Sequence, residues 1–188
     1  MSARVREHAT YEDLLRVPEN MVAELIEGEL FASPRPRGAH TRAASRLGYI
    51  LGPPFDFGEG GPGGWTILDE PELHMGMNVL VPDLAGWRNE RMPEVPDTQV
   101  VTIVPDWICE VLSPSTARLD RAKKLPIYAR NGMQYSWIID VDAQFLEVRR
   151  LENGAWREVA VFTGDKVRAE PFDAIEMDMT RIWGSPPA

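Results

Sequence analysis

The sequence has one cysteine and no long apolar run. A single thiol, Cys109, cannot form an intramolecular disulfide or a cysteine-based zinc cluster, which excludes disulfide scaffolds and zinc ribbons. Cys109 lies in a predicted core strand, so we interpret it as a small buried hydrophobic residue. No apolar stretch approaches the length of a membrane span, and none follows the arginines of Met1–His8. These absences predict a cytoplasmic protein with no membrane contact.

Positive charge and paired histidines are also scarce. The 20 lysines and arginines are outnumbered by 29 aspartates and glutamates, and a net charge of -9 argues against a surface that follows nucleic-acid phosphates throughout. His8, His40 and His74 are widely separated and lack metal-binding spacing, which disfavours a zinc hydrolase. Two basic clusters remain candidates for phosphate contacts, although solvated helix faces account for most such runs. The clusters contain Arg35, Arg37, Arg42 and Arg46, and Arg118, Arg121, Lys123, Lys124 and Arg130.

The order of apolar patterns predicts one α/β (α+β) domain over residues 1–188, in which helices flank a central mixed β-sheet. A short helix capped by Thr10 precedes a hairpin, within Val22–Pro34, that turns at Glu27-Gly28-Glu29. Helical spacing predicts a helix over Ala39–Leu51, which ends at Gly52-Pro53-Pro54 before a flexible glycine-rich loop over residues 55–64. Further strands are expected at Trp65–Met75, Val79–Trp87 and Asp106–Leu112, and a strand meander at Tyr135–Val141, Gln144–Leu151 and Trp156–Phe162.

A helix is expected between the strand that ends at Leu112 and the meander. Ser113-Pro114-Ser115-Thr116 is typical of a helix start, and Asn131-Gly132 is a stop signal. Pro126 complicates the pattern, because a proline inside a helix costs about 3 kcal/mol. We therefore expect the regular helix to begin only a turn before Pro126, with Asp120–Lys124 in a cap or an irregular first turn.

Two acids, Asp83 and Glu110, stand inside apolar segments that are typical of buried strands. Burying a carboxylate costs several kcal/mol unless a metal, a cation or hydrogen bonds compensate it. Pairing of their strands could bring the acids together, and two carboxylates with a backbone carbonyl suit a hard cation such as Mg²⁺. Such an ion can lower the pKa of a bound water and stabilise charge on a phosphate oxygen. The pair therefore indicates a functional site.

Other roles explain the same two acids. Asp83 could accept backbone hydrogen bonds in a turn after Pro82, and Glu110 could pair with Arg121 or Lys124 as a structural bridge. A glycosidase that uses the carboxylates as acid and base is a third interpretation. It is disfavoured because the neighbouring basic cluster has no part in that chemistry.

Pro82-Asp83, followed by Glu110 on the next core strand, resembles the motif of the PD-(D/E)XK nuclease superfamily, which has the restriction-endonuclease-like fold. Leu112 departs from the motif, because it stands where a lysine is expected. Over about residues 10–183 the sequence resembles the Uma family, prokaryotic proteins described as endonucleases and long classed as a domain of unknown function. The resemblance is carried by Glu24–Leu30, His40, Val81–Leu84, Glu110–Thr116, Asp120-Arg121 and Lys124–Arg130.

The resemblance implies a magnesium-dependent endonuclease, with manganese as a substitute, that hydrolyses phosphodiester bonds of DNA. Asp83 and Glu110 would be the metal ligands, and Glu24 would be a further catalytic acid near the same ion. The catalytic lysine would have moved to the following helix, where Lys124 matches. The accessory positions would be His40, whose role we cannot derive, Asp120 and Lys123.

Each of these roles has a structural alternative. Lys124 lies four residues after Asp120, the spacing of a helical ion pair worth a few tenths of a kcal/mol. Glu24 could be a solvent-facing hairpin residue, and His40 could be a capping residue.

The expected partner is DNA, bound through its backbone. The contacts would come from Arg37, Arg42, Arg118 and Arg121, and cleavage of both strands would suit a homodimer. The low pI and Leu112 keep a second function open. The chain could be a catalytically inactive nuclease-fold module that binds nucleic acid or protein.

Overall fold

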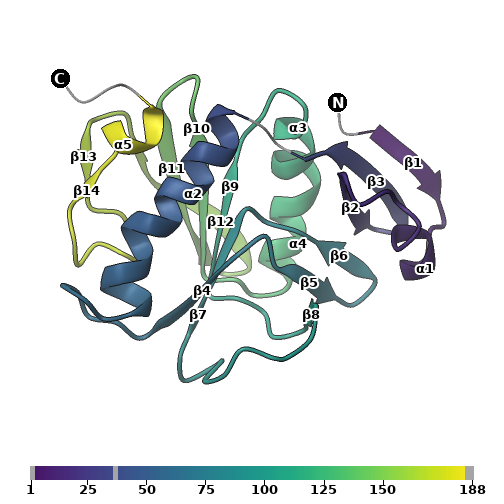
Figure 1. The fold of residues 1–188 in the computed structure, drawn as a ribbon, viewed down its shortest axis with the longest axis horizontal. Coiled ribbons are helices and arrows are strands. Elements are labelled where there is room, and N and C mark those ends of the chain that lie inside the picture. The colour runs from purple at the N-terminus through teal and green to yellow at the C-terminus, as the bar shows by residue number, and fades with distance from the viewer. Residues whose placement is uncertain (1–2, 36–37, 185–188) are drawn as a thin grey trace.

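Two β-sheets, with helices between and beside them, form the framework of the molecule (Figure 1). The computed structural model describes residues 3–35 and 38–184. Within these residues, each main sheet has six strands, and β13 (Lys166–Val167) pairs with β14 (Met177–Asp178) in a small ribbon. We call the sheet that contains the N-terminal strands sheet A, and the sheet that runs through the middle of the molecule sheet B.

Sheet B is the central mixed sheet that the sequence predicts. Its strand order is β12-β11-β10-β9-β7-β4, and its one parallel pair among the described strands is β9 with β10. A parallel pair needs a crossover connection, which the helical segment between β9 and β10 supplies. Its strands are β4 (Trp65–Asp69), β7 (Leu84–Arg88), β9 (Trp107–Val111), β10 (Tyr135–Asp140), β11 (Phe145–Glu152) and β12 (Ala155–Phe162). The last three are the predicted meander.

Sheet A contains the predicted N-terminal hairpin. The strand order is β1-β3-β2-β6-β5-β8. Glu27 and Gly28 connect β2 to β3 with φ angles of 53° and 81°, the two positive values that a type I′ turn requires. The strands are β1 (Ala3–Glu7), β2 (Met21–Ile26), β3 (Glu29–Pro34), β5 (Glu72–Met75), β6 (Asn78–Leu80) and β8 (Val100–Val101).

Two of the predicted strands are wrong, because the chain changes sheets within each. The segment Trp65–Met75 divides into β4 of sheet B and β5 of sheet A, and Val79–Trp87 divides into β6 of sheet A and β7 of sheet B. The second break falls at Pro82-Asp83, where proline has no N–H to donate to a strand ladder. Asp83 therefore precedes a strand, whereas the alternation pattern predicted that it lies within one.

Helix α2 (Ala39–Leu51) has the predicted bounds, but the chain does not leave helical geometry at Gly52. One π-helical turn, η1 (Gly52–Asp56), follows, and Phe55 within it is buried in the core. The segment predicted to be a flexible loop is thus partly helical. It is also hydrogen-bonded back to η1, through the N–H groups of Phe57, Glu59 and Gly63 and the carbonyls of Gly52, Pro53 and Pro54.

The helical segment between β9 and β10 has the predicted irregular turn. It consists of α3 (Ala117–Leu119), a π-helical turn η2 (Asp120–Lys124) and α4 (Leu125–Arg130). Pro126 lies in the first turn of α4, where a missing N–H costs least. The Leu125 N–H bonds to the Asp120 carbonyl five residues back, which is the hydrogen bond of a π turn. The first short helix, α1 (Tyr11–Leu14), has the predicted Thr10 cap.

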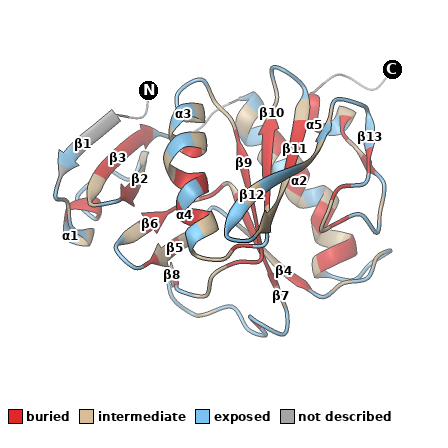
Figure 2. Cartoon of the chain, turned by 180° about the vertical axis from the view of Figure 1, so that it is seen from behind, coloured by how far each residue is buried: buried red, intermediate tan, exposed pale blue. Residues whose placement is uncertain are grey.

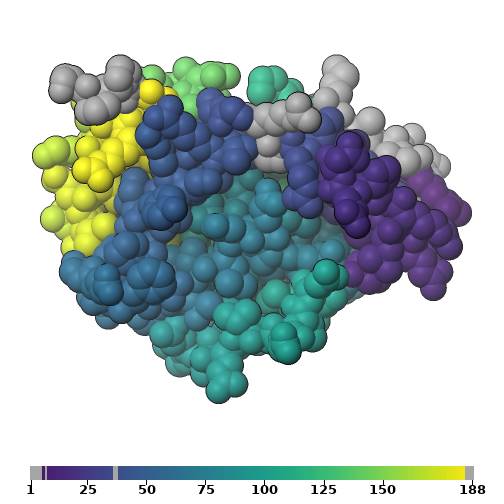
Figure 3. Space-filling model, viewed as in Figure 1, coloured from purple at the N-terminus to yellow at the C-terminus, as the bar shows by residue number. Residues whose placement is uncertain are grey.

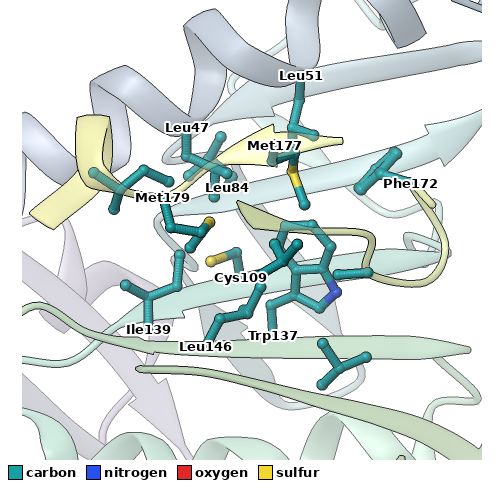
Figure 4. Packing of buried hydrophobic residues seen from close by; sticks show 14 of the residues in the cluster. Leu47, Leu51, Leu84, Cys109, Trp137, Ile139, Leu146, Phe172, Met177 and Met179 are labelled. Carbon is teal, nitrogen blue, oxygen red and sulfur yellow. The ribbon is translucent and has the colours of Figure 1, made fainter. Parts of the chain in front are cut away.

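The core lies on both faces of sheet B. On one face, α2 and the C-terminal segment, which ends with α5 (Thr180–Trp183), pack against Leu84, Cys109 and Trp137 of sheet B (Figure 4). On the other face, α4 and sheet A pack against Ile108 and Ile138. Viewed from behind, β9 and β10 are largely buried, whereas much of β12 is exposed (Figure 2). Cys109 is fully buried, as its predicted strand indicates. No helix in the described ranges is long and apolar enough to span a membrane.

Candidate active site

Strand pairing brings Asp83 and Glu110 together at one end of sheet B. Antiparallel pairing of β7 with β9 places Leu84 opposite Cys109, so the preceding Asp83 lies next to Glu110. The Val111 N–H donates to Asp83 Oδ2 over 2.7 Å, which fixes the aspartate against β9. The predicted meeting of these two acids therefore holds, although Asp83 reaches the site from a break between strands.

Lys124 points into this pair from η2. Its ammonium nitrogen lies 2.8 Å from Glu110 Oε1, 2.9 Å from Glu24 Oε1 and 3.5 Å from Asp120 Oδ1. The same nitrogen also donates to the Val81 carbonyl over 3.3 Å. The side chain is only 3% exposed. Lys124 thus contacts acids from both sheets as well as Asp120, its partner at helical spacing.

Glu24 is brought to the site by sheet A. It lies on β2 and is 6% exposed, so it is not the solvent-facing hairpin residue that was the structural alternative. Its Oε1 accepts a 2.9 Å hydrogen bond from the Val81 N–H as well as the contact from Lys124. Val81 belongs to the segment that leads from β6 to Asp83, so Glu24 also holds that segment in place.

The local helix geometry explains how Lys124 reaches the acids. Pro126 has no N–H and so cannot continue a regular helical hydrogen-bond ladder, and the π turn at η2 comes just before it. The Trp156 Nε1–H donates to the Leu125 carbonyl over 2.7 Å. Side chains four residues apart share one helix face, so Lys124 and Tyr128 both point toward sheet B. The Tyr128 hydroxyl donates to Glu110 Oε1 over 2.7 Å.

His40 stands beside Asp83 as the second residue of α2. Its Nε2 lies 3.5 Å from Asp83 Oδ2, and its buried Nδ1 has no hydrogen-bond partner among the described residues. Burial lowers the pKa of His40, but the hydrogen bond and the charge of Asp83 outweigh burial and raise it. The imidazole therefore faces the same acid that the sequence places at the site.

These side chains line a cavity of about 680 Å³ between α2, the N-terminal hairpin and the strand ends. On the surface of the molecule, α2 and the N-terminal hairpin lie on either side of atoms that belong to the middle of the chain (Figure 3). Six of the lining residues are acidic, whereas the basic ones are Arg35, His40 and Lys124. Arg35 pairs with Glu70 at 3.0 Å, so Lys124 is left to balance the buried acids.

The excess of acid appears in the pKa values. Burial, and then the charges of Asp120, Asp83 and Glu24, raise the pKa of Glu110 well above its usual value despite Lys124. Burial likewise raises the pKa of Asp120 to about 6. Burial lowers the pKa of Lys124, but the carboxylates of Glu110 and Glu24 outweigh that effect and raise it, so Lys124 is an ammonium ion at neutral pH.

The remaining predicted site residues that the structure describes lie outside the cavity. Lys123 pairs with Glu29 at 2.6 Å, and Arg121 pairs with Glu147 at 2.8 Å. Arg42 on α2 and Arg118 on α3 are exposed, and Arg37 lies outside the described residues. The sequence-based interpretation missed Tyr128, whose position four residues after Lys124 was an available signal. It also missed Ser113, Ser115 and Thr116 as residues that line the cavity.

The donor atoms at the site fit a magnesium-like ion. The hydrogen bonds at the two acids use Asp83 Oδ2 and Glu110 Oε1, which leaves Asp83 Oδ1 and Glu110 Oε2 for a cation. Within the described ranges, no group of three or more His, Cys, Asp or Glu side chains has the arrangement of a metal site, so the candidate ligands are these two carboxylates. Two carboxylates completed by water are the usual protein ligands of Mg²⁺, so the arrangement suits that ion better than zinc.

A mixed sheet with paired acids at its strand ends and a lysine from the next helix is the arrangement expected of a restriction-endonuclease-like fold. The model of the Uma2 family, described as "Putative restriction endonuclease", matches residues 9–180, and the chain belongs to this family. A crystal structure of a protein from Anabaena variabilis ATCC 29413, described as a putative nuclease belonging to DUF820, has the same fold. The TM-score is 0.75 and the identity is 23%, over 93% of this chain and 97% of the other. The search of curated proteins returned no match.

Proposed function

We propose that the protein is a metal-dependent endonuclease that hydrolyses phosphodiester bonds of DNA. The carrying observation is the cavity at the strand ends, where Glu24, Asp83, Glu110 and Asp120 gather around one lysine. Buried carboxylates with so little compensating charge favour a bound cation. Membership of a family described as restriction endonucleases supports this chemistry over other metal-dependent reactions.

Asp83 and Glu110 are the proposed ligands of Mg²⁺, with Mn²⁺ as a substitute. When bound, such an ion would supply a water of lowered pKa and would stabilise negative charge on the phosphate. The Val111 N–H and the Lys124 ammonium hold the two carboxylates in position before any ligand arrives, so little reorganisation is needed. His40 adds a contact to the same carboxylate, because its Nε2 lies 3.5 Å from the Asp83 oxygen that accepts from the Val111 N–H.

Lys124 acts as a charged donor in this proposal. Because its pKa is raised, it does not accept a proton from water at neutral pH. An ammonium group has three protons, and Glu110, Glu24 and the Val81 carbonyl already lie within reach of them. Lys124 therefore holds the acids together, and its charge also favours an incoming phosphate.

DNA is the proposed substrate, and its backbone is bound from the rim of the cavity. Arg42 and Arg118 are exposed and are the arginines we propose as phosphate contacts. Arg121 contributes less, because Glu147 already pairs with it. A homodimer would place two such sites on one duplex, which suits cleavage of both strands.

Plasmid nicking tests this function. Purified protein is incubated with supercoiled plasmid and Mg²⁺ or Mn²⁺, and wild type is compared with Asp83→Asn and Lys124→Ala. We expect wild type to nick and both variants to lose at least about 100-fold in rate. Glu147→Gln is the matched control, because it neutralises a buried acid outside the cavity and should keep its activity per folded molecule. Equal cleavage by all four proteins contradicts the mechanism.

One observation favours a second function, an inactive nuclease-fold module that binds nucleic acid or protein. Lys124 pairs directly with Glu110 and Glu24, so the acids have a partner even without an ion. Thermal melting separates the two functions. A metal site predicts that Mg²⁺ raises the Tm of wild type but not of Asp83→Asn, because only the folded protein binds the ion. An inactive module predicts no response in either protein.

A further inference from the structure

Tyr128 is a buried polar residue that the proposed mechanism does not yet use. Its side chain is fully buried in the core between α4 and sheet B. Its hydroxyl donates to Glu110 Oε1 over 2.7 Å, which is the one hydrogen bond of that hydroxyl in the described part of the chain. A phenol at this position needs a polar partner, since an unpaired buried hydroxyl costs about 1–3 kcal/mol.

The phenol and the ammonium of Lys124 converge on the same oxygen. Tyr128 lies 2.7 Å and Lys124 lies 2.8 Å from Glu110 Oε1. Both side chains project from one helix face, four residues apart, Lys124 at the end of the π turn η2 and Tyr128 in α4. The two donors together occupy Oε1, which leaves Oε2 as the oxygen of Glu110 without a hydrogen bond among the described residues, and Glu110 lines the cavity.

We propose that Tyr128 is a positioning residue that fixes which oxygen of Glu110 is presented to the metal ion. The inference rests on the proposed function, since it concerns the geometry of the same site. Lys124 alone does not define that geometry, because its ammonium is shared among Glu110, Glu24 and Asp120. The Tyr128 ring is buried in the core, and among the described residues its hydroxyl donates a hydrogen bond to Glu110 only.

The same contact explains how the site tolerates Leu112. In the motif, the strand places a lysine two residues after the acid, whereas here the cation comes from the helical segment that follows the strand. A cation that pairs with the ligand itself competes with the metal for that carboxylate. By sharing Oε1 with Lys124, Tyr128 confines this competition to one oxygen and leaves the other for the ion.

The test compares Tyr128→Phe with Tyr11→Phe. Each change removes one phenol that donates to a glutamate over 2.7 Å, but Tyr11 bonds to Glu72, outside the cavity. Mn²⁺ binding is measured by electron paramagnetic resonance, and kcat and KM are measured by nicking with Mn²⁺. We expect Tyr128→Phe to weaken Mn²⁺ binding by about 10-fold or more and to lower kcat with KM for DNA unchanged. Tyr11→Phe should match wild type in each measurement.

A purely structural role for Tyr128 gives a different result. It predicts a lower Tm without metal for Tyr128→Phe, with Mn²⁺ affinity and kcat per folded molecule as in wild type, and that outcome overturns the inference. Should the variant unfold, the titration is repeated in sucrose, which favours the folded state. If wild type itself binds no Mn²⁺ and nicks no DNA, the proposed function fails first and the inference fails with it.

Discussion

Glu110 and Glu147 are both buried glutamates on the same face of sheet B, yet their surroundings are opposite. Glu110 is 2% exposed and shares one ammonium with Glu24 and Asp120. Glu147 is 5% exposed and has two guanidinium partners of its own, Arg121 and Arg149. Three acids therefore share one cation around Lys124, whereas two cations serve one acid around Glu147.

The difference separates a structural ion pair from a candidate site. At Glu147, burial raises the pKa, but the hydrogen bonds from Arg121 and Arg149 outweigh burial and lower it. At Glu110, burial raises the pKa and Lys124 does not compensate it. A fold gains nothing from leaving acids under-compensated in its interior, so the imbalance at Glu110 indicates a role other than stability. Three measurements of stability test whether the two glutamates differ in this way.

The largest effect is expected from Lys124→Met. The variant leaves Glu24, Glu110 and Asp120 buried without their shared cation, and it should lose about 3 to 5 kcal/mol of unfolding free energy at about pH 8. Urea unfolding provides the measurement. The matched control is Lys123→Met, which removes an adjacent but half-exposed ion pair with Glu29 and should cost at most about 1 kcal/mol. Similar losses in the two variants would show that Lys124 is no more than another helix lysine.

A smaller loss is expected from Glu147→Gln. The amide keeps the shape but gives up charge-assisted hydrogen bonds from two arginines, at a cost of about 2 kcal/mol near neutral pH. Because the pKa of Glu147 is lowered on folding, its contribution is present above its usual value of 4.5 and is lost as pH falls below it. Wild type and variant should therefore converge in acid. Glu158→Gln, on the exposed side of β12, is the control and should change little. A gap that persists in acid would contradict the pairing.

The smallest effect, with the opposite pH dependence, is expected from Asp120→Asn. Folding raises the pKa of Asp120 from 3.8 to about 6, so its contribution is present below 3.8 and is lost as pH rises through about 6. At about pH 8 the charged aspartate opposes folding, and the asparagine variant should be more stable than wild type. The advantage should disappear at about pH 4, where wild type is protonated. Urea unfolding across this range measures it, and a destabilised variant at pH 8 would mean that Lys124 fully compensates Asp120.

Local chemistry made part of this molecule predictable from its sequence. The type I′ turn at Glu27-Gly28 and the irregular turn before Pro126 depend on residues within a few positions of each other. The meeting of Asp83 and Glu110 also followed from short-range pattern, because two neighbouring apolar segments that pair as strands align their ends. Such features need no knowledge of how distant parts of the chain pack.

Other features depend on distant packing. The family resemblance placed Glu24 and Lys124 at one site, but nothing near Glu24 in the sequence itself indicates their 2.9 Å contact, because sheet A must first pack against α4. The division of Val79–Trp87 between two sheets escaped for the same reason, since alternation alone cannot distinguish one long strand from two short ones. Tyr128 was hidden by its type, because an aromatic residue at helical spacing is usually only core.

The contacts between the N-terminal hairpin and the η2–α4 helical segment affect the order in which the parts of the site come together during folding. Lys123 and Glu29 are 94 positions apart, Arg130 and Glu27 are 103 apart, and the Lys124–Glu24 pair joins the same two parts of the chain. Contacts of such sequence separation form late, because a long loop must close before they contribute. During synthesis Glu24, Asp83 and Glu110 emerge before Lys124, so they lack their shared ammonium until the helix docks. The candidate site is thus completed by one of the later folding events, and a partly synthesised chain does not contain it.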